Sequence, residues 1–221
     1  MAISKLNFNS LNVTPSANSA IGFDSGADDL ETGAGGGSMV FIKKLTASSS
    51  GTLSFVDGAS SVVLDSTYKE YMFIFNNIHP ASADANLQVN FSIDAGSNYN
   101  VAKTSTFFRT QHGESGSGAE LGYEASLDLA QGTAVKKISQ TSGADNDQGI
   151  SGILHLFNPS STAFVKHFIS QTNVSYAYSE PYFYSSYTAG YANTTSAVDA
   201  VQFSINSGNM DTGTITLYGI T

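Results

Sequence analysis

The four histidines, with the acidic residues, are the first candidates for metal binding or acid–base chemistry. They are His79, His112, His155 and His167. None belongs to an H-x-H, H-x-x-x-H or H-E-x-x-H pattern, so a zinc site is not expected. His155 and His167 lie on the two arms of an expected hairpin, where His155 would face Phe164. We therefore interpret the histidines as ordinary hydrogen-bonded side chains and predict no metal.

Two glycine-rich tracts come close to catalytic motifs without completing them. In Gly113–Gly118, Ser117 occupies the last glycine position of a G-x-S-x-G nucleophile elbow. In Gly33–Gly37, Ser38 falls where the last glycine of G-x-G-x-x-G belongs, and no lysine follows for a phosphate loop. A carboxylate pair for glycoside cleavage would meet only in space, which the sequence does not reveal. We expect a protein that is not an enzyme, with no catalytic residue and no cofactor.

Two acidic segments contain oxygen ligands of the kind that calcium prefers. The first holds Asp24, Asp28, Asp29 and Glu31, and the second is 145–149, Asp-Asn-Asp-Gln-Gly. The second resembles half of a calcium loop but lacks the spaced third ligand and the bidentate glutamate. Solvated loops explain both segments better than a metal site does.

A tyrosine-rich stretch is the best candidate for binding. Its tyrosines are Tyr176, Tyr178, Tyr182, Tyr184, Tyr187 and Tyr191. Tyrosine offers rigid contact area, stacks on sugar rings and hydrogen-bonds through its hydroxyl. The same residues would equally suit the edge of a sandwich or a subunit interface, so both interpretations stay open.

The composition excludes several classes of partner. Hydrophobic residues make up 41% of the 221 residues and charged residues 12%, with a formal net charge of −9 and no cysteine. So few basic residues argue against nucleic acid and anionic membranes as partners. The basic pairs Lys43-Lys44 and Lys136-Lys137 are expected on solvated faces. Without cysteine there is no disulfide framework, so burial and strand pairing must supply the stability.

The strands expected to position these residues are organised around Tyr71–Pro80. Aromatic and branched side chains fall on both faces of that run, which predicts a strand covered from both sides. Asp57-Gly58 predicts a hairpin turn between 52–56 and 61–64, and 150–157 with 163–171 predicts another hairpin. The pattern indicates an all-β, antiparallel two-layer β-sandwich, jelly-roll-like, spanning residues 39–221.

Residues 1–38 differ from the rest and are expected to form an extended N-terminal docking arm. The arm ends in the flexible joint Gly33–Ser38. It is too short to build a core of its own, although it carries several large apolar residues. Those docking residues are Ile3, Leu6, Phe8, Leu11, Val13, Ile21 and Phe23.

Three segments resemble small virion structural proteins of tailed, notably marine, bacteriophages. They are the opening Met1–Phe8, the stretch from Tyr71–Pro80 to Asp94–Tyr99, and the ending Ser207–Ile220. The likeness covers the general pattern of most of residues 39–221. Its motifs are structural, so it carries over no catalytic residue. It implies a virion component. Because Met1–Phe8 alternates apolar and polar residues, unlike the apolar core of a signal peptide, we expect synthesis in the host cytoplasm.

From this resemblance we expect a non-enzymatic virion protein attached through its arm, a tail- or fibre-associated module that displays a binding surface. The first alternative is a capsid decoration (cement) protein that stabilises neighbouring capsid subunits. The second is a carbohydrate-binding module. The expected partners are other virion proteins and further copies of the chain in a homo-oligomer, with a trimer preferred. A host surface glycan is a further candidate ligand, whereas nucleic acid and membrane are not.

Overall fold

The computed structural model describes residues 21–23, 30–32, 38–177 and 181–221 of the chain. The chain divides into two compact units, Met1–Val40 with Thr221 and Phe41–Ile220. In the first unit, β1 (Ile21–Phe23) pairs antiparallel with β2 (Leu30–Thr32), and Phe23 lies opposite Leu30.

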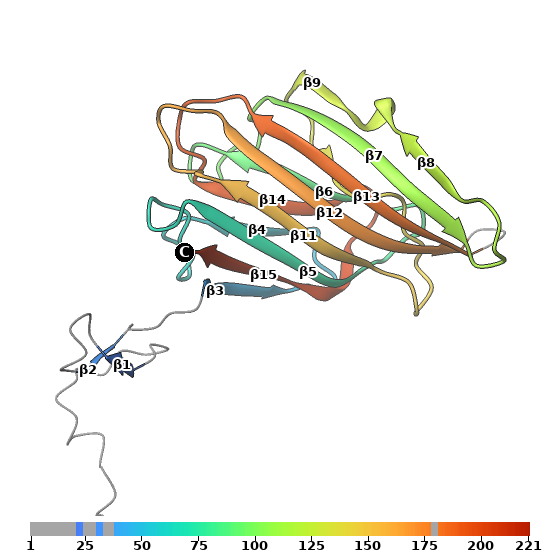
Figure 1. Ribbon diagram of the computed structural model, residues 1–221, viewed down its shortest axis with the longest axis horizontal. Helices are drawn as coiled ribbons and strands as arrows, with labels where there is room; N and C mark the ends of the chain where they lie inside the picture. The colour runs from blue at the N-terminus through green and yellow to red at the C-terminus, as the bar shows by residue number, and fades with distance from the viewer. Residues whose placement is uncertain (1–20, 24–29, 33–37, 178–180) are drawn as a thin grey trace, which may run out of the picture. The chain divides into compact units, whose positions relative to one another are not determined.

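The larger sheet of the second unit has nine strands, and its pairings from β15 to β8 are antiparallel. Figure 1 shows these strands side by side. In spatial order they are β3 (Met39–Thr46), β15 (Met210–Ile220), β5 (Glu70–Pro80), β11 (Ile150–Phe157), β12 (Lys166–Ala177), β13 (Pro181–Ala192), β7 (Lys103–Gly113) and β8 (Glu120–Tyr123), with β9 (Leu129–Gly132) also pairing with β7.

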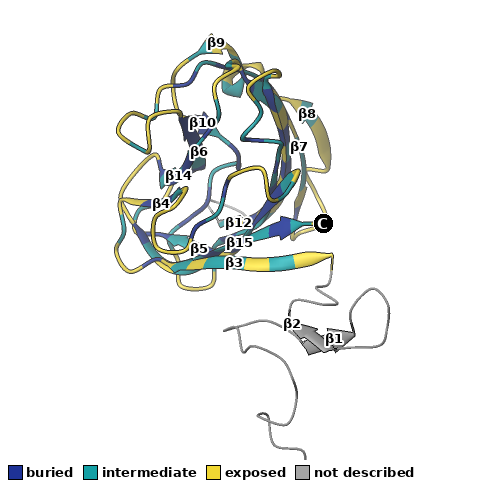
Figure 2. Ribbon diagram, turned by 90° about the vertical axis from the view of Figure 1, so that its left-hand side faces the viewer, coloured by how far each residue is buried: buried dark blue, intermediate teal, exposed yellow. Residues whose placement is uncertain are grey.

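The smaller sheet has four antiparallel strands and forms the second layer (Figure 2). In spatial order they are β10 (Lys136–Lys137), β6 (Leu87–Ser92), β14 (Ala200–Ile205) and β4 (Thr52–Val56). The 3₁₀ turn η2 (Ala125–Leu127) precedes β9. The predicted all-β, antiparallel two-layer sandwich is therefore confirmed. This strand order does not confirm the jelly-roll arrangement.

Aromatic side chains join the two layers at the centre. The ring centroid of Phe55 (β4) lies 5.3 Å from that of Phe73 (β5). The Phe203 ring (β14) lies 5.2 Å from Phe73 and 5.1 Å from Phe75, and all three contacts are edge-on. All four rings are buried. Such pairs add about 0.5–1.5 kcal/mol each to the gain from burial alone. The core is thus built on β5, the strand that the sequence places at its middle.

The strand β5 is confirmed, but its expected cover on both sides is not. Tyr71, Phe73 and Phe75 are buried against the second layer. Met72 and Ile74 point the opposite way, where the described residues provide no further layer. Met72 lies between His155 and Tyr218, and Ile74 between Ile153 and Thr216, at paired positions of the same sheet. Neighbouring side chains shield these two residues where a layer was expected.

The turn at Asp57-Gly58 is confirmed, with Gly58 at φ +74°, but the hairpin is not. Residues 61–64 do not pair as a strand with β4, whose partner is β14. Instead Leu64 N–H donates to Asp57 Oδ1 at 2.8 Å, and the Leu64 side chain is buried. The sequence pattern predicted that residues 61–64 would pair with β4. In the structure β14, which is distant in sequence, pairs with β4 instead.

The hairpin of β11 and β12 is confirmed with a different register. Its loop spans 158–165, so His155 lies opposite Ile169 and not Phe164. Phe164 lies in the loop, exposed. The longer loop places His155 and Ile169 on the same face of the large sheet, where the candidate site lies.

Candidate functional site

One face of the large sheet points away from the second layer, and we call it the outer face. The alternation of burial along β12 defines it, because Phe168, Ser170 and Thr172 are buried while His167 and Ile169 are exposed. The strand register carries this alternation to the neighbouring strands. Across β11, β12, β13, β7 and β8 the outer face consists of Ser151, Ile153, His155, Phe157, His167, Ile169, Gln171, Asn173, Ser175, Phe183, Ser185, Tyr187, Ala189, Tyr191, Thr104, Thr106, Phe108, Thr110, His112, Leu121 and Tyr123.

Among these described residues of the outer face there is no Lys, Arg, Asp or Glu. The chain as a whole has 9 basic and 18 acidic residues. Two carboxylates lie at the border of the face: Glu70 contacts His155, and Asp128 accepts a hydrogen bond from the Tyr123 hydroxyl. A charge-depleted, aromatic centre with a polar border is the composition of a protein interface.

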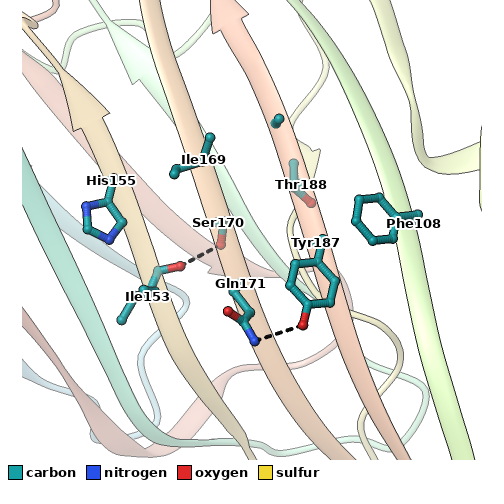
Figure 3. Close-up of a pocket in the computed structure, with 9 residues that line it drawn as sticks. Phe108, Ile153, His155, Ile169, Ser170, Gln171, Tyr187 and Thr188 are labelled. Atoms are coloured by element: carbon teal, nitrogen blue, oxygen red, sulfur yellow. Dashed lines mark hydrogen bonds between the residues drawn. The ribbon is translucent and has the colours of Figure 1, made fainter.

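An apolar groove of about 310 Å³ crosses the outer face (Figure 3). Ile153 and Ile169 line one side of it. On the other side the rings of Phe108 and Tyr187 stack with centroids 4.9 Å apart and planes 9° apart. The Tyr187 hydroxyl accepts a hydrogen bond from Gln171 Nε2 at 3.1 Å, which fixes the ring orientation. The groove is preformed and lined mainly by carbon.

A second groove of about 320 Å³ lies beside the first, and Ile169 and Ala189 border both. Gly190 lines it, and a Cβ there would point to the inner side of the sheet, 2.8 Å from Ser105 Cβ and 3.0 Å from Phe168 Cζ. His167 and Tyr191, whose ring centroids are 6.0 Å apart, line the second groove. The outer face therefore has both projecting side chains and hollows.

His155, at the wall of the first groove, hydrogen-bonds to the carboxylate of Glu70. Its Nδ1 lies 2.5 Å from Glu70 Oε1, and its ring stacks at 6.3 Å on Phe157. The carboxylate holds the imidazole at the groove wall. Among the described residues, no group of three His, Cys, Asp or Glu side chains could hold a metal ion.

The predicted tyrosines do not share one surface. Tyr187 and Tyr191 lie on the outer face, whereas Tyr176, Tyr182 and Tyr184 point to the inner side of the sheet. Tyr178 lies outside the described residues. The step of three positions from Tyr184 to Tyr187 reverses the face, because side chains alternate along a strand.

On the inner side of the large sheet Tyr184 packs against Arg109, and Tyr182 and Tyr176 pack against Tyr184. The Arg109 guanidinium carbon lies 5.7 Å from the Tyr184 ring centroid, and its Nε lies 2.6 Å from Glu124 Oε1. Tyr182 stacks on Tyr184 with centroids 6.1 Å apart. Burial raises the pKa of the Tyr184 hydroxyl. We call this group, with Tyr176, the tyrosine–arginine cluster.

Three lysines are buried, which we did not predict from the sequence. Lys103, Lys136 and Lys166 are each fully buried, which overturns the prediction that Lys136 lies on a solvated face. Lys103 Nζ donates to Val101 O at 2.7 Å, Lys136 Nζ to Leu127 O at 2.6 Å and Lys166 Nζ to Phe164 O at 2.8 Å. The signal that could have found them is their place in period-two runs, such as Val101, Lys103, Ser105 and Phe107.

Burial lowers the pKa of Lys103 and of Lys136 to about 8, and it lowers the pKa of Lys166 as well. No salt-bridge carboxylate contacts these ammonium groups among the described residues, and none of the three lines a groove of the outer face. Their hydrogen bonds to backbone oxygens indicate a structural role.

Most of the predicted docking arm lies outside the described residues. This applies to Ile3, Leu6, Phe8, Leu11 and Val13. Ile21 and Phe23 belong to β1. In the described part of the chain, no helix is long and apolar enough to cross a membrane.

Comparison with known proteins identifies no relative. No protein-family model, no curated protein and no solved structure matches the chain. The chemistry of its surfaces therefore has to support any proposal about its function.

Proposed function

We propose that this chain is a non-enzymatic structural protein of a tailed-bacteriophage virion, a tail- or fibre-associated module that assembles with other virion proteins. The observation that supports assembly is the outer face. Five neighbouring strands expose aromatic and aliphatic side chains there, interspersed with Ser, Thr, Asn, Gln and His. No charged residue stands among the described positions of that face, in a chain of net charge −9. An uncharged surface of this extent, with exposed aromatic and aliphatic side chains near its centre, is typical of a surface that another protein covers.

The virion context comes from the resemblance of the opening, the central strand and the ending to small phage structural proteins. In this proposal residues 1–38 attach the sandwich to a neighbouring virion protein. The apolar positions Ile3, Leu6 and Phe8 make the contacts. The sandwich then presents its surfaces to other copies and to the host.

The tyrosine–arginine cluster favours carbohydrate binding as a second candidate function. Sugar recognition combines the faces of aromatic rings with polar groups held in fixed positions. Tyr182 and Tyr184 supply stacked rings, and Arg109 is fixed by Glu124 at 2.6 Å. A host surface glycan would be the ligand for this second function.

The proposal is tested on purified phage particles from cells that express this chain. Mass spectrometry of separated tail and head fractions is expected to find the chain in the tail fraction, at a fixed ratio to the other tail proteins. Recovery in the head fraction alone would favour a capsid decoration protein. Absence of the chain from washed particles would overturn the virion proposal.

A glycan array probed with the full-length chain tests the second candidate. Arg109→Ala removes the guanidinium and should abolish retention of any glycan that the cluster binds. Arg109→Lys keeps the charge without the planar fork, and it should restore little binding if stacking and bidentate contacts matter. Retention that is unchanged in both variants would exclude the cluster as the binding site.

A further inference from the structure

We infer that the outer face is the contact surface between two copies of this chain, joined face to face in a symmetric dimer. This inference rests on the proposed assembly function and names the partner of its surface. Four features of the described residues carry it: charge, shape, area and the absence of a covering layer.

The charge distribution favours a second copy over a partner of opposite charge. A chain of net charge −9 that recognised a basic partner would present its carboxylates at the contact. The described residues of the outer face present none, so charge complementarity contributes nothing there. Two copies, each strongly acidic overall, meet with the least repulsion through a large surface that has no charge.

The shape of the outer face is self-complementary. Phe108 and Ile169 project from it and are 41% and 47% exposed. The two grooves beside them have volumes of about 310 and 320 Å³. Ile153, Tyr187 and Ala189 are among the residues that line the first, and Ala189 and Tyr191 line the second together with Thr104, Thr106 and His167. A symmetric interface requires projections and hollows on the same surface, because the projecting side chains of each copy must fill the hollows of the other.

The area is sufficient for a stable dimer. The strands β12, β13 and β7 have 12, 12 and 11 residues, and β11 and β8 add 8 and 4. At about 3.3 Å per residue and about 4.8 Å between strands, they present roughly 750 Å². Standard protein interfaces bury about 800 Å² per partner, so this face alone approaches that size.

The central strand supports the same conclusion. Its sequence is apolar on both faces, which is the pattern of a strand with a layer on each side. The second sheet provides one layer. On the other side Met72 is already buried by its neighbours, whereas Ile74 is half-buried beside Ile153 and continues the apolar surface toward β5. A second copy would provide the missing layer, with sheets about 10 Å apart as in ordinary sandwiches.

A face that contacts its own copy is related to it by a two-fold axis. The expected assembly through this face is therefore a dimer, in place of the trimer expected from the sequence. A trimer would need two different contact surfaces on each chain.

The test is the mass of the full-length chain in solution, measured by light scattering after size-exclusion chromatography and by sedimentation equilibrium. The wild-type chain is expected to be a dimer at micromolar concentration. Ile169→Lys places an ammonium group at the centre of the face, and it should raise the dissociation constant by roughly 100-fold or more. Because Ile169 is exposed in the single copy, the thermal unfolding of the variant should match that of the wild type at concentrations too low for the dimer to form.

The matched control is Phe164→Lys. Phe164 is even more exposed, at 70%, but lies in the loop between β11 and β12, outside the outer face. The Phe164→Lys substitution should leave the dimer intact. A second face variant, Phe108→Lys, guards against a local effect at position 169 and should dissociate the dimer as well.

A wild-type chain that stays a monomer at the highest soluble concentration would overturn the inference. So would a dimer that survives both face variants. If Phe8→Lys dissociates the assembly while Ile169→Lys does not, the arm and not the face joins the copies. Incorporation of the Ile169→Lys chain into particles would separate the two proposals, because the virion proposal would stand while the dimer would be dispensable.

Discussion

At the scale of single residues, the buried lysines give the most specific electrostatic prediction, which concerns how stability depends on pH. Lys103 and Lys136 are held by backbone oxygens and Asn90 in a core that disfavours their charge. Lys136 also lies 5.2 Å from the Phe107 ring centroid, a contact that offsets part of that cost. The chain retains charged groups where hydrophobic residues would be expected.

These lysines predict that the folded state becomes more stable as the pH rises above neutrality. The pKa of each is about 8 in the fold against 10.5 for a solvated lysine of the unfolded chain, so below pH 8 both states are protonated and the cost of burial is fully present. Between pH 8 and 10.5 the folded state loses a proton that the unfolded chain keeps. The free energy of unfolding should therefore rise by about 1–2 kcal/mol per lysine from about pH 7 to about pH 9.5. Urea unfolding at a series of pH values measures this slope.

Lys103→Met removes one of the two titrating ammonium groups while keeping an unbranched side chain of similar length. Its slope with pH should be shallower than that of the wild type. Lys44→Met is the matched control, because Lys44 is exposed on β3 and its substitution should leave the slope unchanged. Equal slopes in all three chains would show that Lys103 is hydrated in the fold.

At the scale of elements, β5 offers two adjacent residues with opposite surroundings. Phe73 is fully buried and contacts Phe55 and Phe203, whereas Ile74 is half-buried on the other side of the sheet. Phe73→Ala should lower the free energy of unfolding by about 3–5 kcal/mol, since it removes a buried ring and leaves a cavity. Chemical denaturation of the purified chain provides the measurement.

Ile74→Ala is the control within the same strand and should cost about 1–2 kcal/mol in the single copy, because less of its surface is buried. The comparison is made in the Ile169→Lys background, so that self-association does not contribute. Similar losses for the two substitutions would contradict the assignment of inner and outer faces.

The sequence predicted where strands lie far better than which strands pair with each other. Local composition located β5, as a run of aromatic and branched residues on both faces, and it located the hairpin of β11 and β12. The pairing of β4 with β14, across about 150 positions, has no local signal and displaced the hairpin expected after Asp57-Gly58. The covering of β5 on one side alone was likewise invisible, since a strand covered by its own chain and one that awaits a partner have the same pattern.

The candidate site was predictable only in part for the same reason. The tyrosine-rich stretch drew attention to β12 and β13, and Tyr187 and Tyr191 do lie on the outer face. The face itself appears only when the register of five strands is known, since Phe108 reaches Tyr187 from a segment nearly 80 positions away. The absence of charge across the described residues of those strands is a property of the assembled sheet and of no single segment.

At the scale of the whole molecule, the division at Val40 and Phe41 predicts that the sandwich folds without the segment that precedes it. The core cluster begins at Ala47 and lies within the second unit. A chain that lacks residues 1–38 keeps all of β3 and every core residue of that cluster. Its circular dichroism and its midpoint of thermal unfolding should match those of the full chain within about 2–4 °C, the shift that roughly 1 kcal/mol produces in a domain of this size.

The same truncation should remove the chain from assembled particles, because in the proposed function the arm makes the attachment. The truncated and full-length chains are supplied together, and their ratio in purified particles is compared with their ratio in the lysate. A full-length chain with Ile3, Leu6 and Phe8 changed to Ser is the matched variant, since it keeps the length of the arm and removes only its apolar contacts. We expect both altered chains to be excluded by at least tenfold. Incorporation of the truncated chain at the wild-type ratio would show that attachment occurs through the sandwich, and the outer face would then be the first surface to test.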